Sequence, residues 1–172
     1  MEEPVVGGTV AIGCTKAYQT AKSLKASCFI YYLHKTLVAV NSIENFKYRI
    51  ADDKIYINDR IDASATIGRQ DGTFGFSLIE YNPDFKIFEQ NALAEIERIQ
   101  NTTGLFTRSF DDDNLIHFSA IPWLNFTSLS HARSYTFPDS CPKISFGKMI
   151  TSETGKKTMA MSVHVHHGLM DG

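Results

Sequence analysis

The last third of the chain is rich in strand-like segments, and this pattern constrains the fold more than any other feature. Apolar and β-branched side chains recur over residues 115–121, around 125–130, and over 144–150 and 158–166. The last two stretches are predicted to pair across a turn at Thr154-Gly155, because glycine favours tight connections between strands. This part of the chain is therefore predicted to form a sheet.

Strand and helix signals are interspersed in the first two thirds of the chain. Further strand patterns occupy residues 5–13, 46–50, 54–57, 63–67 and 73–79. Asp52-Asp53 is a plausible hairpin turn between two of them. Helical spacing of apolar residues covers 15–24, where Thr15 can act as the cap, and 26–41. The combination predicts an α/β protein with a mixed β-sheet and flanking helices.

The clearest helix signal begins at Asn82-Pro83-Asp84. Asparagine can cap a helix, proline has the right φ for the first turn, and aspartate favours the positive helix end. One apolar stripe follows, made of Phe85, Phe88, Ala92, Ile96 and Ile99. Charged residues, Glu95 among them, fall elsewhere on the helix. We therefore expect an amphipathic helix that ends before a polar loop over residues 101–114.

Composition and charge exclude several classes of protein. The 172 residues suffice for one full core, and we expect a single domain over 1–172. A formal net charge of −2 gives no general attraction to nucleic acid or to an anionic membrane. No apolar run has the length of a membrane span, and the first residues do not resemble a signal peptide. Three cysteines without zinc spacing predict free thiols in a reducing, cytoplasmic compartment.

Two clusters of polar residues raise the question of a metal site. Asp111-Asp112-Asp113 could hold a cation, but no ligand-spaced partner follows, so a solvated loop is the favoured interpretation. His164, His166 and His167 crowd the last strand. His164 and His166 share one strand face whereas His167 projects from the other, and no third ligand is evident. The sequence thus predicts no metal site.

The strongest functional signal is His167-x-x-x-Asp171-Gly172, directly after the last strand. Two longer blocks precede it: Phe-Ser-Ala-Ile-Pro-Trp-Leu-Asn-Phe-Thr-Ser over 118–128, and Pro-Lys-Ile-Ser-Phe-Gly-Lys over 142–148. With Thr73-Phe74 further upstream, the set resembles the chloramphenicol acetyltransferase family, which carries His-His-x-x-x-Asp-Gly, Ser-Ala-Leu-Pro-Trp and Pro-x-x-Thr/Ser-x-Gly/Ala-Lys. A lone motif is weak, and the ordered set makes the resemblance specific.

The resemblance assigns three residues to the chemistry. His167 matches the general base that deprotonates the acceptor hydroxyl, a task suited to a neutral imidazole. Ser119 matches a serine whose hydroxyl stabilises the oxyanion of the tetrahedral intermediate. Asp171 matches a structural aspartate that pairs with an arginine and supports the loop behind the histidine. Without the other blocks, a core histidine and an ordinary strand serine would be the favoured interpretations.

Five further residues match positions near the substrates in the family. Ser145 matches a position, often threonine, that contacts the transition state through a water. Lys148 matches a lysine near the coenzyme A phosphate, and Trp123 matches a tryptophan of the coenzyme tunnel. Phe74 matches an aromatic residue lining the acceptor pocket. His131 falls where many members carry a leucine that contacts chloramphenicol, so the acceptor is less constrained than the reaction.

The resemblance also implies an architecture and a reaction. We expect a two-layer α/β sandwich, assembled as a homotrimer with active sites between subunits. Acetyl-CoA would be the co-substrate, with no permanently bound cofactor, and its acetyl group would pass directly to the 3-hydroxyl of chloramphenicol. A dihydrolipoyl-type acyltransferase, which shares the fold and the motif, is one alternative. A catalytically weak homologue that serves as an interaction scaffold is the other.

The family pattern extends beyond this chain at both ends. It begins with a strand and helix bearing Trp-x-Arg-x-Glu-His-Phe, and it continues past Asp-Gly into a long C-terminal helix. We therefore expect a shortened form of the domain. Without the N-terminal arginine, Asp171 would lack its partner and the His167 loop would be loosened.

Overall fold

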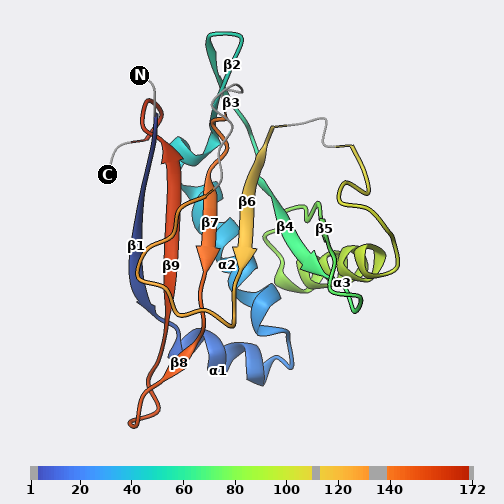
Figure 1. Cartoon of the computed structure of the whole chain (residues 1–172), viewed down its shortest axis with the longest axis vertical. Coiled ribbons are helices and arrows are strands. Elements are labelled where there is room, and N and C mark those ends of the chain that lie inside the picture. The colour runs from blue at the N-terminus through green and yellow to red at the C-terminus, as the bar shows by residue number, and fades with distance from the viewer. Residues whose placement is uncertain (1–3, 110–112, 132–138, 171–172) are drawn as a thin grey trace.

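The computed structural model describes residues 4–109, 113–131 and 139–170, so Asp111, Asp112, Asp171 and Gly172 lie outside the described residues. Its main sheet has seven strands: β1 (Val5–Gly13), β4 (Asp62–Gly68), β5 (Phe74–Phe76), β6 (Leu115–Ala120), β7 (Lys143–Phe146), β8 (Ile150–Thr151) and β9 (Lys157–His166). Their order is β1-β9-β7-β6-β4-β5, with β8 paired to β9 (Figure 1). Because β6 is parallel to β4 and β7 while β9 is antiparallel to β1 and β7, the predicted mixed sheet is confirmed.

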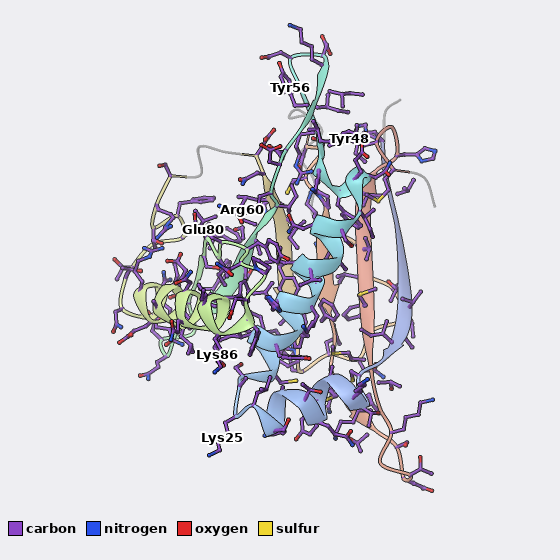
Figure 2. The ribbon with its side chains drawn as sticks, turned by 180° about the vertical axis from the view of Figure 1, so that it is seen from behind. Lys25, Tyr48, Tyr56, Arg60, Glu80 and Lys86 are labelled. Atoms are coloured by element: carbon purple, nitrogen blue, oxygen red, sulfur yellow. The ribbon has the colours of Figure 1, made fainter. Side chains whose placement is uncertain are left out.

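Helices cover one face of this sheet: α1 (Thr15–Ser23), α2 (Cys28–Ser42) and α3 (Phe85–Gln100). Figure 2, seen from behind, shows α2 in front of the strands, whereas Figure 1 shows it behind them. Leu33 and Leu37 of α2 are fully buried and share one core cluster with Phe118 of β6 and Ile144 of β7. The core therefore lies between the helical layer and one sheet face, and the opposite face is left for polar residues.

The third helix begins two residues later than the sequence suggested, because its cap is Asp84 and not Asn82. Its N-cap is Asp84, whose carboxylate accepts hydrogen bonds from the N–H groups of the first turn, while Asn82 accepts one from the Asp84 N–H. Glu95 was expected on an exposed face, but it is buried and forms ion pairs with Arg98 and Arg108. Two guanidinium partners offset the cost of burying this carboxylate.

Three expected details differ in the structure. Residues 125–130 do not form a strand, because Phe126 is buried against Gly147 instead of pairing along the sheet. The stretch 73–79 contains only the three-residue β5, followed by a single bridge between Ile79 and Ala63. Thr15 does not cap α1, because its hydroxyl accepts a 2.8 Å hydrogen bond from the Lys157 N–H and thereby joins α1 to β9.

A two-stranded hairpin projects from the end of the molecule where the strand β9 ends (Figure 1). It consists of β2 (Tyr48–Ala51) and β3 (Lys54–Ile57), preceded by the short 3-10 helix η1 (Glu44–Lys47). Asp52 and Asp53 have φ values of 50° and 56°, which confirms the predicted turn, since aspartate tolerates the left-handed region.

A buried arginine connects this hairpin to the main sheet. Arg49 of β2 is 1% exposed, and its guanidinium donates hydrogen bonds of 2.5–2.9 Å to the backbone carbonyls of Phe46, Tyr48, Asp113 and Leu115. These bonds satisfy a group that would otherwise be costly to bury. Among the described residues, no helix has the length and apolar character needed to cross a membrane.

Candidate functional site

A row of hydroxyl side chains crosses the polar face of the sheet. The strand register pairs Ser119 of β6 with Ser145 of β7, Ser145 with Ser162 of β9, and Ser162 with Thr9 of β1. Residues paired in this way project from the same face. Ser145 and Ser162 are fully buried, whereas Ser119 and Thr9 are half-buried. Two sequence-predicted site residues, Ser119 and Ser145, are therefore neighbours on adjacent strands.

Two histidines lie over this row. Nε2 of His131 is 3.2 Å from the Ser145 hydroxyl, and Nδ1 of His164 is 3.3 Å from the Ser162 hydroxyl. The two imidazole rings meet edge to face, with their centroids 4.9 Å apart. The structure thus brings the predicted residue His131 to Ser145. His164 was given no role in catalysis from the sequence, although its place two residues after Ser162 puts it on the same strand face.

His167 occupies a different place, in the turn after β9. It is exposed, and its N–H donates a 2.5 Å hydrogen bond to the Pro4 carbonyl beside the start of β1. The preceding His166 stabilises this turn, because its ring Nδ1 accepts a 3.2 Å hydrogen bond from the Gly168 N–H. Asn45 reaches the same turn from η1 and donates to the Leu169 carbonyl at 2.9 Å. His167 is therefore held at one end of the sheet.

Within one chain, His167 and Ser119 are far apart. His167 lies five residues beyond Ser162, which is about 17 Å along a strand at 3.3 Å per residue. Ser162 and Ser119 are separated by β7, which adds about 10 Å across two strand spacings. Side chains of a few ångströms cannot span such a distance. A single chain consequently does not bring the predicted base and the predicted oxyanion donor together.

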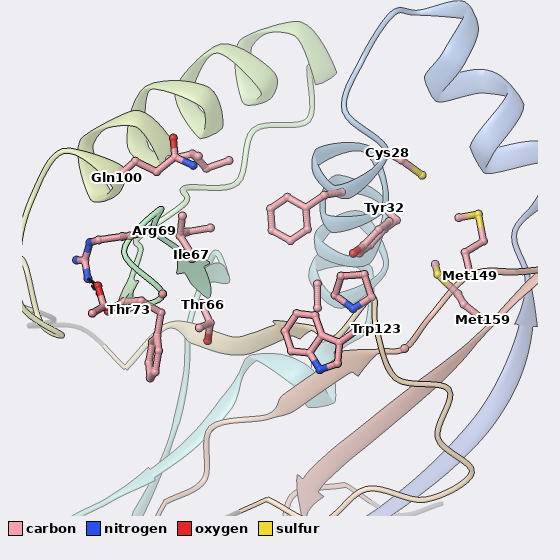
Figure 3. A pocket seen from close by; sticks show the side chains of 18 residues that line it. Cys28, Tyr32, Thr66, Ile67, Arg69, Thr73, Gln100, Trp123, Met149 and Met159 are labelled. Atoms are coloured by element: carbon pink, nitrogen blue, oxygen red, sulfur yellow. Dashed lines mark hydrogen bonds between the residues drawn. The ribbon is translucent and has the colours of Figure 1, made fainter.

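An apolar pocket of about 680 Å³ lies between the helices and the sheet. It is lined by Tyr32 of α2, by Ala120 at the end of β6 and Trp123 after it, and by Ile67 of β4 and Phe74 of β5, among others. Figure 3 shows Arg69 and Thr73 at one side of the pocket and Met149 and Met159 at the other. Two sequence-predicted residues, Trp123 and Phe74, therefore share one cavity.

The pocket lies where two parallel strands part. The pairing of β4 with β6 ends at Ala65 and Phe118, after which β4 continues alongside β5 and β6 alongside β7. The lining residues Ile67 and Ala120 come from the strand segments beyond this point. Ser119, the neighbour of Ala120, projects from the opposite sheet face because side chains alternate along a strand. The pocket thus approaches the hydroxyl row from the helical side.

The loop after β7 forms one side of this pocket through a close backbone approach. A Cβ atom at Gly147 would stand 2.9 Å from the Leu124 carbonyl oxygen and 3.0 Å from the Phe126 ring, so only glycine fits without a shift. The next residue, Lys148, is exposed, and its N–H donates a 2.8 Å hydrogen bond to the Leu124 carbonyl. Lys148 therefore stands between Gly147 and Met149, which both line the pocket.

Arg69 places a positive charge at the pocket that was not predicted from the sequence. The Arg69 guanidinium donates hydrogen bonds of 2.7–2.8 Å to the carbonyls of Phe74, Ile99 and Gly104, which fix its position. An arginine after a strand carries no distinctive sequence signal, so only the fold reveals it. Tyr32 was also missed, because a tyrosine at helical spacing normally indicates core.

The family described as chloramphenicol acetyltransferase matches residues 6–172. Chloramphenicol acetyltransferase 3 of Escherichia coli is 30% identical over 155 residues, covering 88% of this chain and 72% of that protein. The chloramphenicol acetyltransferase of Bacillus pumilus is 24% identical over 164 residues, covering 95% and 74%.

Two solved structures extend the comparison. One chloramphenicol acetyltransferase has a TM-score of 0.90 at 31% identity, covering 99% of this chain and 83% of the other. A probable dihydrolipoamide acetyltransferase from Listeria monocytogenes has a TM-score of 0.71 at 12% identity, which shows a shared fold alone.

Proposed function

Because this chain belongs to the chloramphenicol acetyltransferase family and is an acyltransferase, we propose that it transfers acetyl from acetyl-CoA to the 3-hydroxyl of chloramphenicol. The observation that carries the proposal is the family match across residues 6–172, which spans the hydroxyl row, the pocket and the His167 turn. Acetylation of that hydroxyl would inactivate the antibiotic, and no permanently bound cofactor is needed.

In the proposed reaction, His167 accepts the proton of the 3-hydroxyl while the hydroxyl oxygen attacks the thioester carbonyl carbon. The Ser119 hydroxyl donates a hydrogen bond to the resulting oxyanion. The tetrahedral intermediate then collapses, the carbon–sulfur bond breaks, and the thiolate of coenzyme A takes the proton from the His167 imidazolium. We expect direct transfer, because no cysteine or serine adjoins His167 in the His-x-x-x-Asp-Gly motif, and burial raises the pKa of the Cys14, Cys28 and Cys141 thiols, which weakens them as nucleophiles.

We place the pantetheine arm of acetyl-CoA in the apolar pocket. Trp123 would contact this arm, and Lys148 beside the pocket would pair with a coenzyme phosphate. The parting of β4 and β6 gives the thioester a route from the helical side toward Ser119. Phe74 lies in the same cavity, and we assign it to the acceptor end, where its ring would stack on the nitrophenyl group. Ser145 and His131, joined at 3.2 Å, would complete the polar wall.

The active protein is proposed to be a homotrimer whose active sites lie between chains. The separation of His167 from Ser119 within one chain supports this arrangement, because the reaction needs both side chains within hydrogen-bond distance of one substrate. Cyclic association presents the same two surfaces at every interface, so each interface would pair the His167 turn of one chain with the hydroxyl row of the next.

The choice of acceptor can be tested by acetyl-CoA turnover. Release of free coenzyme A thiol would be measured with chloramphenicol, with dihydrolipoamide and with no acceptor, and the product identified by mass spectrometry. We expect thiol release that depends on chloramphenicol and yields a singly acetylated product. Turnover with dihydrolipoamide alone would assign the chain to the dihydrolipoyl type, and the absence of turnover with either acceptor would refute the proposed substrate.

A further inference from the structure

Three side chains with different donor atoms meet at the start of β6 and β7. One ring nitrogen of His117, one carboxylate oxygen of Asp139 and the sulfur of Cys141 all lie within 4.8 Å of one another. His117 and Asp139 are exposed, while Cys141 is half-buried. Over residues 4–109, 113–131 and 139–170, this is the one group of three such donors that approach so closely. The catalytic proposal assigns none of them a role.

The backbone holds these residues in place. The β6–β7 register pairs His117 with Lys143, and the His117 N–H donates to the Pro142 carbonyl at 2.9 Å, which fixes β6 against the segment that leads into β7. The Asp139 carboxylate accepts a 2.9 Å hydrogen bond from the Cys141 N–H, which closes a local turn and directs both side chains to one place. The cluster therefore combines His117 of β6 with Asp139 and Cys141 of the segment that leads into β7.

We propose that His117, Asp139 and Cys141 bind a divalent transition-metal ion, with zinc the best fit. Imidazole nitrogen, carboxylate oxygen and thiolate sulfur together suit zinc, whereas calcium and magnesium take oxygen ligands. Tetrahedral zinc holds its donors about 3.3–3.8 Å apart, so a small rotation of the exposed His117 and Asp139 side chains closes the site. A water completes the fourth position.

Three neighbouring side chains affect how strongly the ion binds. The Lys143 ammonium forms an ion pair with the Asp139 carboxylate, so the metal must displace it. The Cys141 thiol donates to the Leu115 carbonyl at 2.9 Å, and binding replaces the thiol proton with the metal, releasing one proton. Burial is the largest effect on the Cys141 thiol and raises its pKa to about 12, so it opposes loss of the thiol proton, whereas the positive charge of Arg49, which donates to the same carbonyl, acts in the opposite direction.

The metal-free protein titrated with Co²⁺ and then Zn²⁺ tests this site. We expect one equivalent of Co²⁺ to bind with a thiolate-to-cobalt charge-transfer band, which Zn²⁺ abolishes by displacement. Cys141→Ser should remove the band, and His117→Asn should weaken binding at least about tenfold. Lys143→Gln should tighten binding, because it frees the Asp139 carboxylate.

Cys28→Ser and His164→Asn are the matched controls, since they remove another half-buried thiol and another sheet histidine outside the cluster. Both should bind Co²⁺ as the unchanged protein does, and circular dichroism would verify that every variant is folded. The proposal is overturned if the unchanged protein binds no Co²⁺ saturably. It is also overturned if the band survives in folded Cys141→Ser or disappears in Cys28→Ser.

Discussion

Mixing two inactive variants tests whether the active site is shared between chains. His167→Ala removes the proposed base, and Ser119→Ala removes the proposed oxyanion donor, at a cost of about 10²–10³ in kcat. Because these side chains are roughly 20 Å apart within one chain, each site would take His167 from one chain and Ser119 from the next. In randomly mixed trimers, both residues are intact at about one quarter of interfaces, so the mixture should recover about a quarter of normal activity.

The assay is chloramphenicol-dependent thiol release from the two variants, unfolded together and refolded as a mixture. A mixture of Ser119→Ala and Ser145→Ala is the matched control, since these two serines are neighbours in the same chain and no interface would combine an intact pair. That mixture should recover nothing. If folded, mixed oligomers of His167→Ala and Ser119→Ala stayed as inactive as each variant alone, the shared site would be refuted.

Three further predictions follow from individual side chains. Trp123→Ala should raise the KM for acetyl-CoA about tenfold, yet change the free energy of unfolding by less than about 0.5 kcal/mol, because the indole is 76% exposed; an unchanged KM would remove Trp123 from the coenzyme site. Arg49→Met should lower the free energy of unfolding by about 3 kcal/mol in urea titrations, because four backbone carbonyls lose their donor; a loss below about 1 kcal/mol would contradict this. Burial lowers the pKa of His34 in the folded protein. As pH falls below about 6.5, His34 therefore takes up a proton in the unfolded chain before it does so in the folded protein, and its contribution to stability is lost. His34→Phe should therefore lose less stability than the unchanged protein between pH 7.5 and pH 5, and an equal loss would count against the buried neutral ring.

The sequence predicted secondary structure correctly where the signals for an element lie within the element itself. The strand over residues 5–13 and the helix that ends near Gln100 were predicted closely, because their signals are local. The exceptions are residues with long-range partners. Thr15 bonds to Lys157 instead of capping its own helix, and Glu95 is buried because Arg108 reaches it from another segment. No local rule could anticipate those partners.

In the candidate site too, features set by local patterns were predicted, and features set by long-range contacts were not. Alternation along β9 correctly placed His164 and His166 on one strand face, whereas the pairing of the strands that carry Ser119 and Ser145 became known only with the fold. The fixed Arg69 guanidinium depends on a contact with Gly104, which follows α3, so the sequence carried no signal for it. The His117, Asp139 and Cys141 cluster depends on strand register, which became known only with the fold.

Acetyl transfer by the His167→Ala variant tests the central claim most directly. Thiol release from acetyl-CoA would be measured with saturating chloramphenicol for the unchanged protein, for His167→Ala and for His164→Ala as a nearby control. We predict that His167→Ala, though folded, loses at least about 10²-fold in kcat, while His164→Ala loses much less. A folded His167→Ala variant that acetylates chloramphenicol at a near-normal rate would contradict the assignment of His167 as the general base.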